Sequence, residues 1–485
     1  MNYRMIFRVL GHVLLITAAL MLLPLIAGLV YGESVVNFII TILLTASIGG
    51  IFISVKPKKQ DLFARDGFAI VGASWIIISL LGALPFVISG DIPNYIDAFF
   101  ETVSGFTTTG ATILTEVETL SRGCMFWRLF THWIGGMGML VFIMAVLPLS
   151  GEHSMHIMRA EVPGPTVGKL VPRAKKTAMI LYLIYLGLTV LEAIFLLCGG
   201  MSFFDAICHA FATAGTGGFS TRNASIAGFN SLYIETVIAV FMYIFAINFN
   251  LYYLILIKKV SVALSSEELH TFLFIVIGSV TIITLNTADF YGGALKALRY
   301  SFFNVATIIS TAGFGTTDFN LWPSLSKSIL VLLMFIGGCA GSTGGGLKLS
   351  RVILLIKAAF ADVKQMVFPQ SVTTVRIDGK RVDSGTIKAS GTYFVLYMLF
   401  LLLTAAIISV DGYDTTTNFT AALSCLSNVG PGLSLVGPTG NYSIFSDFSK
   451  IIMSIAMLLG RLEIYPLLVF VFPDRGIRRF NLKRK

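Results

Sequence analysis

One short pattern recurs four times in this sequence, and it constrains the fold more than any other feature. Each copy is an apolar run followed by Thr or Asn, one further residue and Gly. The glycines that end the copies lie 108, 95 and 117 residues apart. A pattern repeated at such intervals indicates four copies of one structural unit. The copies are DAFFETVSGFTTTG (97–110), DAICHAFATAGTGG (205–218), YSFFNVATIISTAG (300–313) and TNFTAALSCLSNVG (417–430).

A simpler explanation of the pattern is helix packing, because small residues let membrane helices approach closely. That explanation suits Gly135-Gly136-Met137-Gly138, which occurs once. It does not account for a polar residue placed two positions before the glycine in every copy. The four residues at that position are Thr108, Thr216, Thr311 and Asn428.

Composition shows that the repeat belongs to a membrane protein. Of 485 residues, 55% are hydrophobic and 12% are charged, and mean hydropathy is +0.84. Soluble domains carry about 25% charged residues. The net charge of +10 does not indicate nucleic-acid binding, because the basic residues gather in the connections between apolar runs. The five cysteines form no CxxC pair, so they predict neither a disulfide framework nor a metal cluster.

Apolar runs of about 20 residues predict membrane crossings. A leading pair at 5–30 and 35–54 precedes four units, each made of a long span, a run too short to cross, the Thr-x-Gly segment and a second long span. The sequence therefore predicts an all-helical protein with ten crossings. The predicted units comprise 67–89, 95–107 and 125–149; 178–198, 203–215 and 231–257; 270–287, 297–310 and 328–356; and 391–410, 418–427 and 450–472.

Basic residues predict the orientation of these spans, because cytoplasmic connections retain positive charge. One side collects both termini and 27 of the 35 Lys and Arg residues, so we expect both termini to be cytoplasmic. All four Thr-x-Gly segments then enter from the opposite, acidic side. The units share one topology and are parallel repeats about an axis along the membrane normal, unlike the inverted repeats of many secondary transporters.

A re-entrant segment has a specific chemical meaning at membrane depth. Irregular backbone is tolerated there only where it is buried in protein or lines a water-filled cavity. Four such segments around one axis would present a ring of carbonyl oxygens, as potassium-type filters do. Glycine allows the extended turn, and the partly negative end of each short helix would favour a cation at the centre.

These residues resemble a known family. The loops TTGAT, TGGFS, TAGFG and NVGPG, the interruption GGCAGSTGGG and the motif GRLEIYP are similar to those of the membrane subunits of bacterial Trk potassium uptake systems, within the superfamily of Trk, Ktr and HKT transporters. The resemblance covers essentially the whole chain, and the leading hairpin favours Trk over the shorter Ktr subunit. It implies a four-loop selectivity filter that binds potassium through backbone carbonyls, without an organic cofactor. The implied filter residues are Thr108, Thr109, Gly110, Ala111, Thr112, Thr216, Gly217, Gly218, Phe219, Ser220, Thr311, Ala312, Gly313, Phe314, Gly315, Asn428, Val429, Gly430, Pro431 and Gly432.

A glycine-rich stretch interrupts the third unit's last span. Each glycine costs about 1 kcal/mol of helix stability relative to Ala, so six in ten residues predict a break in the helix. The resemblance implies that this break is an intramembrane gating loop. A phosphate-binding loop is the alternative, but GSTGGGLK lacks the GxxxxGK[ST] pattern and follows no strand. The implied gate residues are Gly337, Gly338, Cys339, Ala340, Gly341, Ser342, Thr343, Gly344, Gly345 and Gly346.

Arg461 lies within the last span. A charge near the bilayer centre costs at least about 2.5 kcal/mol, so we expect the side chain to face the protein interior or a cavity. The resemblance implies a pore position beneath the filter, where Arg461 forms part of the gate. A structural ion pair with Glu463 or another acid is the alternative, although side chains two positions apart do not face each other on a helix.

Few other residues suggest chemistry. His153 and His156 lie three apart beside Glu152, and a loop surface explains them better than a metal site. The polar residues Glu192, Glu235, Asn248 and Asn250 lie in or near spans, where they are candidates to satisfy one another. No catalytic constellation is present in the sequence, so we expect a protein that is not an enzyme.

The sequence therefore predicts a potassium uptake channel of the bacterial cytoplasmic membrane. The resemblance implies two partners, a cytosolic nucleotide-binding regulatory subunit of the TrkA type and a second copy of the chain as a homodimer. The alternative is a symporter that moves potassium with sodium or protons by alternating access. The predicted divisions are a leading hairpin at 1–60 and pore repeats at 61–177, 178–265, 266–389 and 390–485.

Overall fold

The protein is described by a computed structural model that covers residues 1–55, 64–138, 174–371 and 373–471. Its architecture is helical, with one two-stranded antiparallel sheet. Within the described residues, six helices are long and apolar enough to cross a membrane, and a seventh crossing follows if one bent pair counts as a span. The predicted all-helical membrane fold is confirmed.

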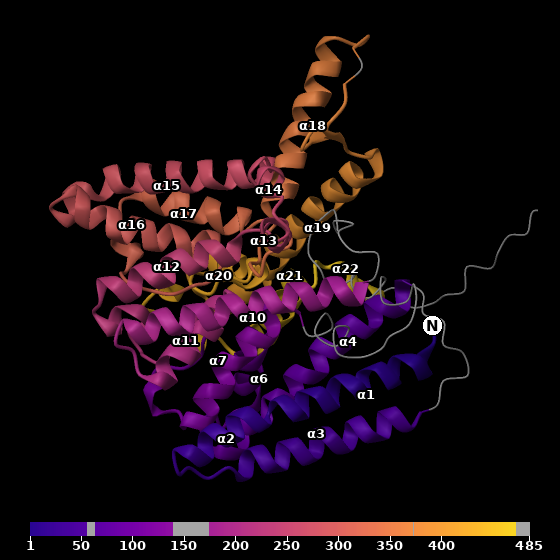
Figure 1. The fold of residues 1–485 in the computed structure, drawn as a ribbon, viewed down its shortest axis with the longest axis vertical. Coiled ribbons are helices and arrows are strands. Elements are labelled where there is room, and N and C mark those ends of the chain that lie inside the picture. The colour runs from indigo at the N-terminus through magenta and orange to yellow at the C-terminus, as the bar shows by residue number, and fades with distance from the viewer. Residues whose placement is uncertain (56–63, 139–173, 372, 472–485) are drawn as a thin grey trace, which may run out of the picture.

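The leading hairpin packs against the first unit. Its first span is kinked at Met21, and its helices lie along the lower side of the molecule in Figure 1. The first unit follows, and of the span predicted at 125–149 only the part up to residue 138 lies within the described residues. The elements are α1 (Tyr3–Leu20), α2 (Leu22–Val30) and α3 (Val36–Ser54), then α4 (Ala64–Gly82), α5 (Leu84–Ser89), α6 (Tyr95–Phe106) and α7 (Arg122–Gly136).

The second and third units repeat the arrangement of span, short helix, loop and span. They occupy the middle and upper parts of Figure 1, where one long helix projects away from the body. The second unit has α10 (Ala174–Cys198), α11 (Phe203–Gly215), α12 (Leu232–Ala246), α13 (Phe249–Leu256) and α14 (Val260–Leu264). The third has α15 (Glu267–Tyr291), α16 (Ala294–Ile309), α17 (Ser324–Ile336) and the projecting α18 (Leu349–Val367), followed by β1 (Arg376–Ile377) and β2 (Lys380–Arg381).

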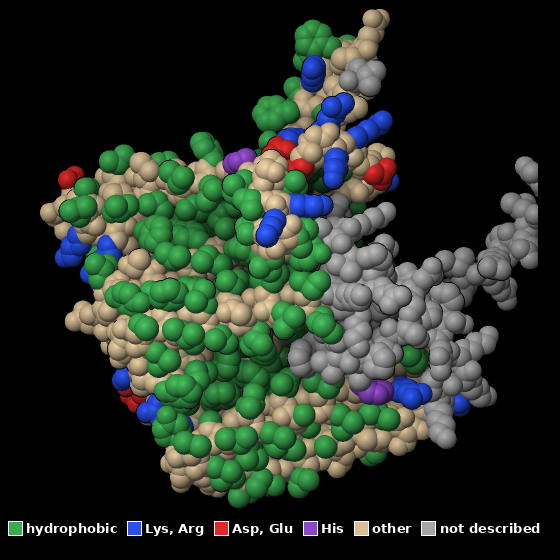
Figure 2. Space-filling model, viewed as in Figure 1, with side chains coloured by type: hydrophobic (Ala, Val, Ile, Leu, Met, Phe, Trp, Pro, Cys, Tyr) green, Lys and Arg blue, Asp and Glu red, His purple; other side chains and the backbone are tan. Residues whose placement is uncertain are grey.

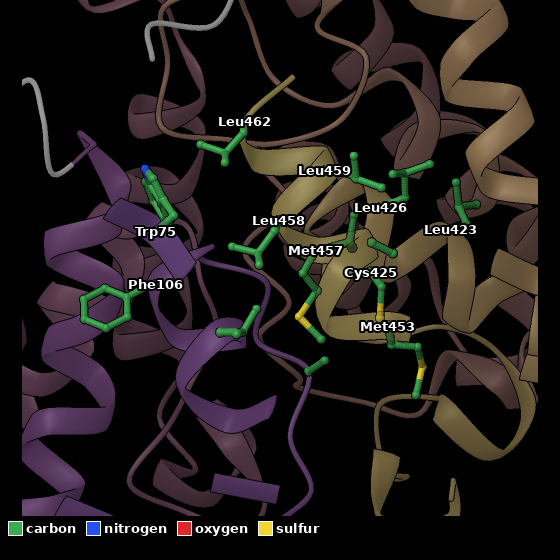
Figure 3. Packing of buried hydrophobic residues seen from close by; sticks show 14 of the residues in the cluster. Trp75, Phe106, Leu423, Cys425, Leu426, Met453, Met457, Leu458, Leu459 and Leu462 are labelled. Atoms are coloured by element: carbon green, nitrogen blue, oxygen red, sulfur yellow. The ribbon is translucent and has the colours of Figure 1, made fainter. Parts of the chain in front are cut away.

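The fourth unit closes the circle of repeats, because its last long helix packs against α6 of the first unit. Figure 3 shows the core between α20 and α21, where Leu426, Leu459 and Met457 lie close together. The unit has α19 (Ser384–Ile408), α20 (Thr415–Ser427), α21 (Asp447–Arg461) and α22 (Tyr465–Val471). Single 3-10 turns lie in the connections, namely η1 (Val117–Thr119), η2 (Ser225–Phe229), η3 (Phe319–Leu321), η4 (Ser409–Asp411), η5 (Ser434–Val436) and η6 (Tyr442–Ile444).

The outer surface of the helix bundle is apolar. Hydrophobic side chains are spread over the described part of the face in Figure 2, whereas Lys and Arg gather at its left rim and around the base of α18. Leu43 on α3, Phe274 on α15 and Val395 on α19 are each more than 60% exposed. Large apolar side chains exposed in this number indicate contact with lipid and not with water.

The four short helices lie where the sequence predicts them. The structure places α6 at 95–106, α11 at 203–215, α16 at 294–309 and α20 at 415–427, within three residues of the predicted bounds at both ends. Three of them begin with a side-chain cap, because Asn94, Ser202 and Asp414 each accept a hydrogen bond from a backbone N–H of the first turn. Such caps fix the start of a helix too short to be stable alone.

Two predicted spans are not continuous. The span predicted at 231–257 is two helices that meet at 90°, and the span predicted at 450–472 ends its first helix at Arg461. The first break has a clear cause, because Ala246 O accepts a hydrogen bond from Cys339 N and Phe249 N donates to Gly341 O. Backbone groups of the glycine-rich stretch thus replace helical partners, which no periodicity in an apolar run could predict.

Candidate ion pathway

The four Thr-x-Gly segments have the same backbone conformation. We call them loop 1 (108–112), loop 2 (216–220), loop 3 (311–315) and loop 4 (428–432). In each loop the first residue and the glycine both have positive φ, with one residue between them. A residue other than Gly rarely adopts positive φ, so its recurrence at one position confirms that the units are true repeats. The φ values are 53° and 79° for Thr108 and Gly110, 55° and 76° for Thr216 and Gly218, 61° and 82° for Thr311 and Gly313, and 55° and 102° for Asn428 and Gly430.

The loops form a closed ring in chain order. Each glycine lies against the backbone carbonyl that precedes the equivalent glycine in the next loop, and the fourth returns to the first. A Cβ added at Gly430 would lie 2.8 Å from Thr109 O, and the other three contacts are closer. Only glycine fits these positions. The contacts are Gly110 to Gly217 O, Gly218 to Ala312 O, Gly313 to Val429 O, and Gly430 to Thr109 O.

A cavity opens onto this ring. Its volume is about 150 Å³, and residues from all four loops line it, including Gly110, Gly218, Gly313 and Gly430. The loops therefore share one space, as a common axis requires. We refer to this cavity as the vestibule.

The short helices end at the loops, so their partly negative C-termini point toward the ring and favour a cation there. Their N-termini carry the caps described above. At the start of α20, the side chain and backbone N–H of Thr417 both donate hydrogen bonds to Asp414. The side-chain bond is the main cause that holds the pKa of Asp414 below its usual value, because hydrogen bonds of this kind stabilise the carboxylate.

Side-chain oxygens near the ring are only partly satisfied. Among the described residues, Thr108 Oγ1 and Asn428 Oδ1 are buried and have no hydrogen-bond partner. Asn428 Nδ2 donates to Thr109 Oγ1 at 2.9 Å and to Met457 O at 3.0 Å. Buried polar atoms normally find partners, so unpartnered oxygens beside a carbonyl ring suit a bound cation.

A buried ion pair supports loops 1 and 2 from behind. Arg128 Nε lies 2.6 Å from Glu101 Oε1, and the guanidinium stacks on Phe219 at 3.5 Å from the ring centroid. Glu101 also accepts hydrogen bonds from Thr112 Oγ1 and Ile113 N. Sequence reasoning missed this pair, although both charges lie in apolar runs, where an ionisable residue is by default a functional candidate.

The glycine-rich stretch at 337–346, here called the barrier segment, lies directly against the filter loops. It separates α17 from α18, so the predicted helix break is confirmed. Gly345 N donates to Thr311 Oγ1 at 2.6 Å, and Gly346 N donates to Ser427 O at 2.9 Å. The segment therefore contacts the starts of loops 3 and 4 on the side away from the short helices' caps.

Arg461 joins the barrier segment to the first unit. Its guanidinium donates to Thr343 O at 2.8 Å, to Gly136 O at 2.7 Å, and also to Gly135 O. All three acceptors are backbone carbonyls, two of them at the C-terminal end of α7. Glu463, two residues further along the chain, pairs with Arg351 at 2.5 Å.

Two further charges hold the barrier segment, and sequence reasoning did not single them out. Lys348 is 2% exposed, and its ammonium donates to Gly344 O. Glu268, at the start of α15, accepts a hydrogen bond from Ala340 N at 2.7 Å. The signal for Lys348 was present in the sequence, because it is a charge within an overlong apolar run.

The remaining sequence candidates do not form a second site. The four polar residues expected to satisfy one another do not meet across helices. Glu235 pairs with Arg299 at 2.7 Å, and Asn248 caps α13 by accepting from Asn250 N. Within the described residues, neither oxygen of Glu192 has a hydrogen-bond partner. Gly136 does serve close packing as expected, because a Cβ there would lie 2.7 Å from Gly215 Cα. His153 and His156 lie outside the described residues. All five cysteines have free thiols.

Comparison with known proteins identifies the family. A family model described as "TrkH: Cation transport protein" matches residues 34–475. The chain is 37% identical to the Trk system potassium uptake protein TrkH of Escherichia coli (strain K12), over 98% of this chain and 99% of that protein. It is 34% identical to the Trk system potassium uptake protein TrkG of the same organism, over 96% and 97%.

A solved structure agrees with these matches. The crystal structure of the potassium transporter TrkH from Vibrio parahaemolyticus is similar with a TM-score of 0.87 and 33% identity, covering 98% of this chain and 99% of that one. Sequence and fold thus agree over nearly the full length, and the resemblance noted from the loops is confirmed. The matched proteins are transporters and not enzymes. This chain belongs to the TrkH family of cation transport proteins.

Proposed function

We propose that this protein conducts potassium inward across the bacterial cytoplasmic membrane, through a filter made by loops 1 to 4. The observation that carries the proposal is the closed ring of four carbonyls, one from each loop. Relatives of the chain are named potassium uptake proteins, which supports potassium as the ion.

The ring supplies what a dehydrated cation needs. The carbonyls of Thr109, Gly217, Ala312 and Val429 are each held against a neighbouring glycine, and in this proposal they replace part of the hydration shell of the ion. All residues of loops 1 to 4 are proposed to take part in ion binding. The short-helix dipoles add favourable potential from four directions.

The four loops are not chemically equal, and this bears on selectivity. The residues that follow the glycines are Ala111, Phe219, Phe314 and Pro431. A filter of four identical strands could repeat its coordination over several layers, whereas this one repeats it reliably only near the glycines. We therefore propose a short filter that admits rubidium and some sodium beside potassium.

The proposed gate lies beneath the filter. The barrier segment contacts loops 3 and 4, and Arg461 ties Thr343 to the end of α7. A guanidinium in the path of a cation opposes its passage by like-charge repulsion. In this proposal conduction requires the barrier segment and Arg461 to move aside together.

The proposed orientation follows the charge of the connections. The projecting α18 and the β1–β2 hairpin carry Lys357, Lys364, Arg376, Lys380 and Arg381, so we place them on the cytoplasmic side together with both termini. The vestibule then faces outward. The membrane potential drives uptake, at about 2.3 kcal/mol per charge per 100 mV.

Two partners are part of the proposal. A cytosolic nucleotide-binding subunit of the TrkA type would regulate the gate, and a second copy of the chain would complete a homodimer. Support comes from α18, where Phe360 and Met366 are 72% and 80% exposed on a helix that leaves the body of the protein. Apolar side chains on a projecting helix favour contact with another protein.

The second candidate is a symporter that couples potassium to sodium or protons. The bent helix pair α12–α13 and the broken span α17–α18 are features that such transporters share. Parallel repeats favour the channel, because alternating access often relies on inverted repeats.

Reversal potential separates the two. Purified protein in planar bilayers is exposed to a potassium gradient, first alone and then with an opposing sodium or proton gradient. A channel reverses at the potassium equilibrium potential, with only the small shift that sodium leak allows, and a proton gradient has no effect. A reversal potential that follows the proton gradient, or that moves with sodium at fixed stoichiometry, would establish symport instead.

A further inference from the structure

Glu192 is a buried acid to which the proposed mechanism gives no role. It lies in the C-terminal third of the apolar span formed by α10 and is 0% exposed. This helix packs along α11, the short helix that ends at loop 2 (Figure 1). An ionisable group at this depth is costly and is rarely retained without a function.

The carboxyl group of Glu192 has no conventional partner. Among the described residues, neither of its oxygens has a hydrogen-bond partner within bonding geometry. The polar side chain that faces it is Thr213 on α11. The hydroxyl proton of Thr213 is already committed, because it is donated to His209 O at 2.9 Å. Thr213 Oγ1 can therefore only accept from Glu192.

The titratable groups on the surrounding helices cannot neutralise a negative charge on Glu192. On its own helix, Tyr185 interacts with it electrostatically but donates its hydroxyl to a backbone carbonyl of α7. His209 on α11 is bonded through both ring nitrogens. Glu235 on α12 is held by an arginine of α16, and Tyr252 on α13 donates to a carbonyl of α12. Within the described residues, none of these groups is hydrogen-bonded to the carboxyl group of Glu192.

We propose that Glu192 is a proton-binding site behind the filter, where a neutral carboxylic acid donates its proton to Thr213 Oγ1. An ionised carboxylate here would be buried without a counter-charge, which proteins avoid by protonating the group. The neutral acid instead has a proton, which it can donate to Thr213 Oγ1 in a hydrogen bond. The ligand of the site is therefore a proton.

The position of the site links the proton to loop 2 and so to conduction. This link rests on the proposed function. The backbone carbonyl of Thr213 accepts a hydrogen bond from Thr216 N at 2.9 Å, at the first residue of loop 2. Loss of the proton would leave a carboxylate that competes for the Thr213 hydroxyl and draws it from His209 O. The end of α11 would then be held differently, and conduction through loop 2 would change.

Infrared difference spectroscopy tests the site without any need for transport. The full-length protein and its E192Q variant are compared at neutral pH, in water and in deuterium oxide. We expect the difference spectrum to contain the carbonyl stretch of one neutral carboxylic acid, shifted by deuterium. The matched control is E235Q, which should remove an ionised carboxylate and no such band. A difference spectrum of E192Q that shows carboxylate bands alone would overturn the proposal.

A second variant tests the partner of the proton. Replacing Thr213 by Ala removes the acceptor and leaves the acid, so the band should move to higher frequency and remain present. An unchanged band position in T213A would mean that Thr213 is not the acceptor.

Flux measurements test the consequence. Potassium flux of the wild type and of E192Q is compared in liposomes between pH 6 and 10. The Gln amide can donate to Thr213 as the acid does, so the two should agree within about twofold at neutral pH and diverge by more than about threefold at the alkaline end. A constant ratio would refute the link to conduction. Absence of potassium flux in the wild type at every pH would instead refute the proposed function, while the infrared result would stand.

Discussion

The filter loops and the barrier segment lie in contact, but they are not held in the same way. Each filter loop is fixed by the backbone of its neighbours, and the same contact occurs four times around a closed ring. The barrier segment occurs once, in the third unit. It is held both by backbone bonds, such as those from Cys339 N to Ala246 O and from Gly346 N to Ser427 O, and by charged side chains. The side chains are Arg461, Lys348 and Glu268, which bond carbonyl and N–H groups of the segment.

In the proposed function, this difference explains how one protein is selective and still gated. A ring of mutual backbone contacts cannot yield at one position without disturbing the next, so the spacing of its carbonyls is maintained. In the barrier segment, bonds from charged side chains add to the backbone bonds, and exchange of those side-chain bonds would loosen the segment. In the proposed function the filter is therefore the rigid part and the barrier segment the movable part, and the following variants test that division.

The largest effect is expected from Gly110→Ala in the filter. The new Cβ would strike Gly217 O and displace one carbonyl of the ring. We expect potassium flux to fall about 100-fold, equivalent to about 3 kcal/mol. The matched control is Gly412→Ala, since Gly412 has the same φ of 79° and nothing within 4 Å of the added Cβ. In both variants the positive φ costs about 1–2 kcal/mol of stability, but only the filter variant should lose flux. Equal flux in the two variants would contradict the ring.

The next effect is of opposite sign and concerns the gate. Arg461→Gln removes a charge and shortens the bridge from Thr343 to α7, and each charge-assisted hydrogen bond contributes about 1.5–3 kcal/mol. We expect potassium flux without any regulatory partner to rise about tenfold. Arg299→Gln is the control. That arginine is bonded to Glu235 on α12 and not to the barrier segment, so the variant should leave flux unchanged. Lower flux in R461Q, with normal folding, would mean that Arg461 supports the open state.

A smaller effect is expected at the vestibule. Glu101→Gln leaves Arg128 uncompensated beside loops 1 and 2, and an unpaired positive charge lowers the local concentration of cations. Flux should fall about threefold to tenfold at low potassium and less at high potassium. The comparison variant is E235Q, which also strands an arginine but at a distance from the vestibule. A uniform loss at all potassium concentrations would argue for damage to the loops instead.

The smallest effect is expected from Glu268→Ala. It removes one hydrogen bond, from Ala340 N, while Arg461 and Lys348 still hold the barrier segment. Unstimulated flux should rise about threefold. The adjacent Glu267→Ala is the control, because the carboxylate of Glu267 pairs with Lys357 and accepts a hydrogen bond from Asp378 N in the hairpin, outside the barrier segment. An equal rise in both variants would show that the N-terminus of α15 acts as a whole.

Much of the filter could be predicted from sequence, for a physical reason. Positive φ and close backbone approach demand glycine, so Gly110, Gly218, Gly313 and Gly430 mark the loops in the sequence itself. The short helices could be predicted equally well, because an apolar run too short to cross a membrane must turn back. The break at the barrier segment followed from the helix cost of six glycines.

The contacts that hold the gate could not be predicted in the same way. The bend between α12 and α13 depends on hydrogen bonds to Cys339 and Gly341, almost 100 residues away. Arg461 was identified as a buried charge, but its acceptors are backbone carbonyls. Every residue has such a carbonyl, so the sequence does not show which ones accept. The Glu101–Arg128 pair joins two elements whose distance only the fold defines.

The most direct test of the central claim is to locate an ion. Crystals of the protein grown with rubidium, measured at its absorption edge, would show where a potassium-like cation binds. We predict an anomalous peak on the axis of the ring, within coordination distance of the carbonyls of Thr109, Gly217, Ala312 and Val429. A transport-competent protein whose rubidium peaks all lie away from that axis would contradict the account.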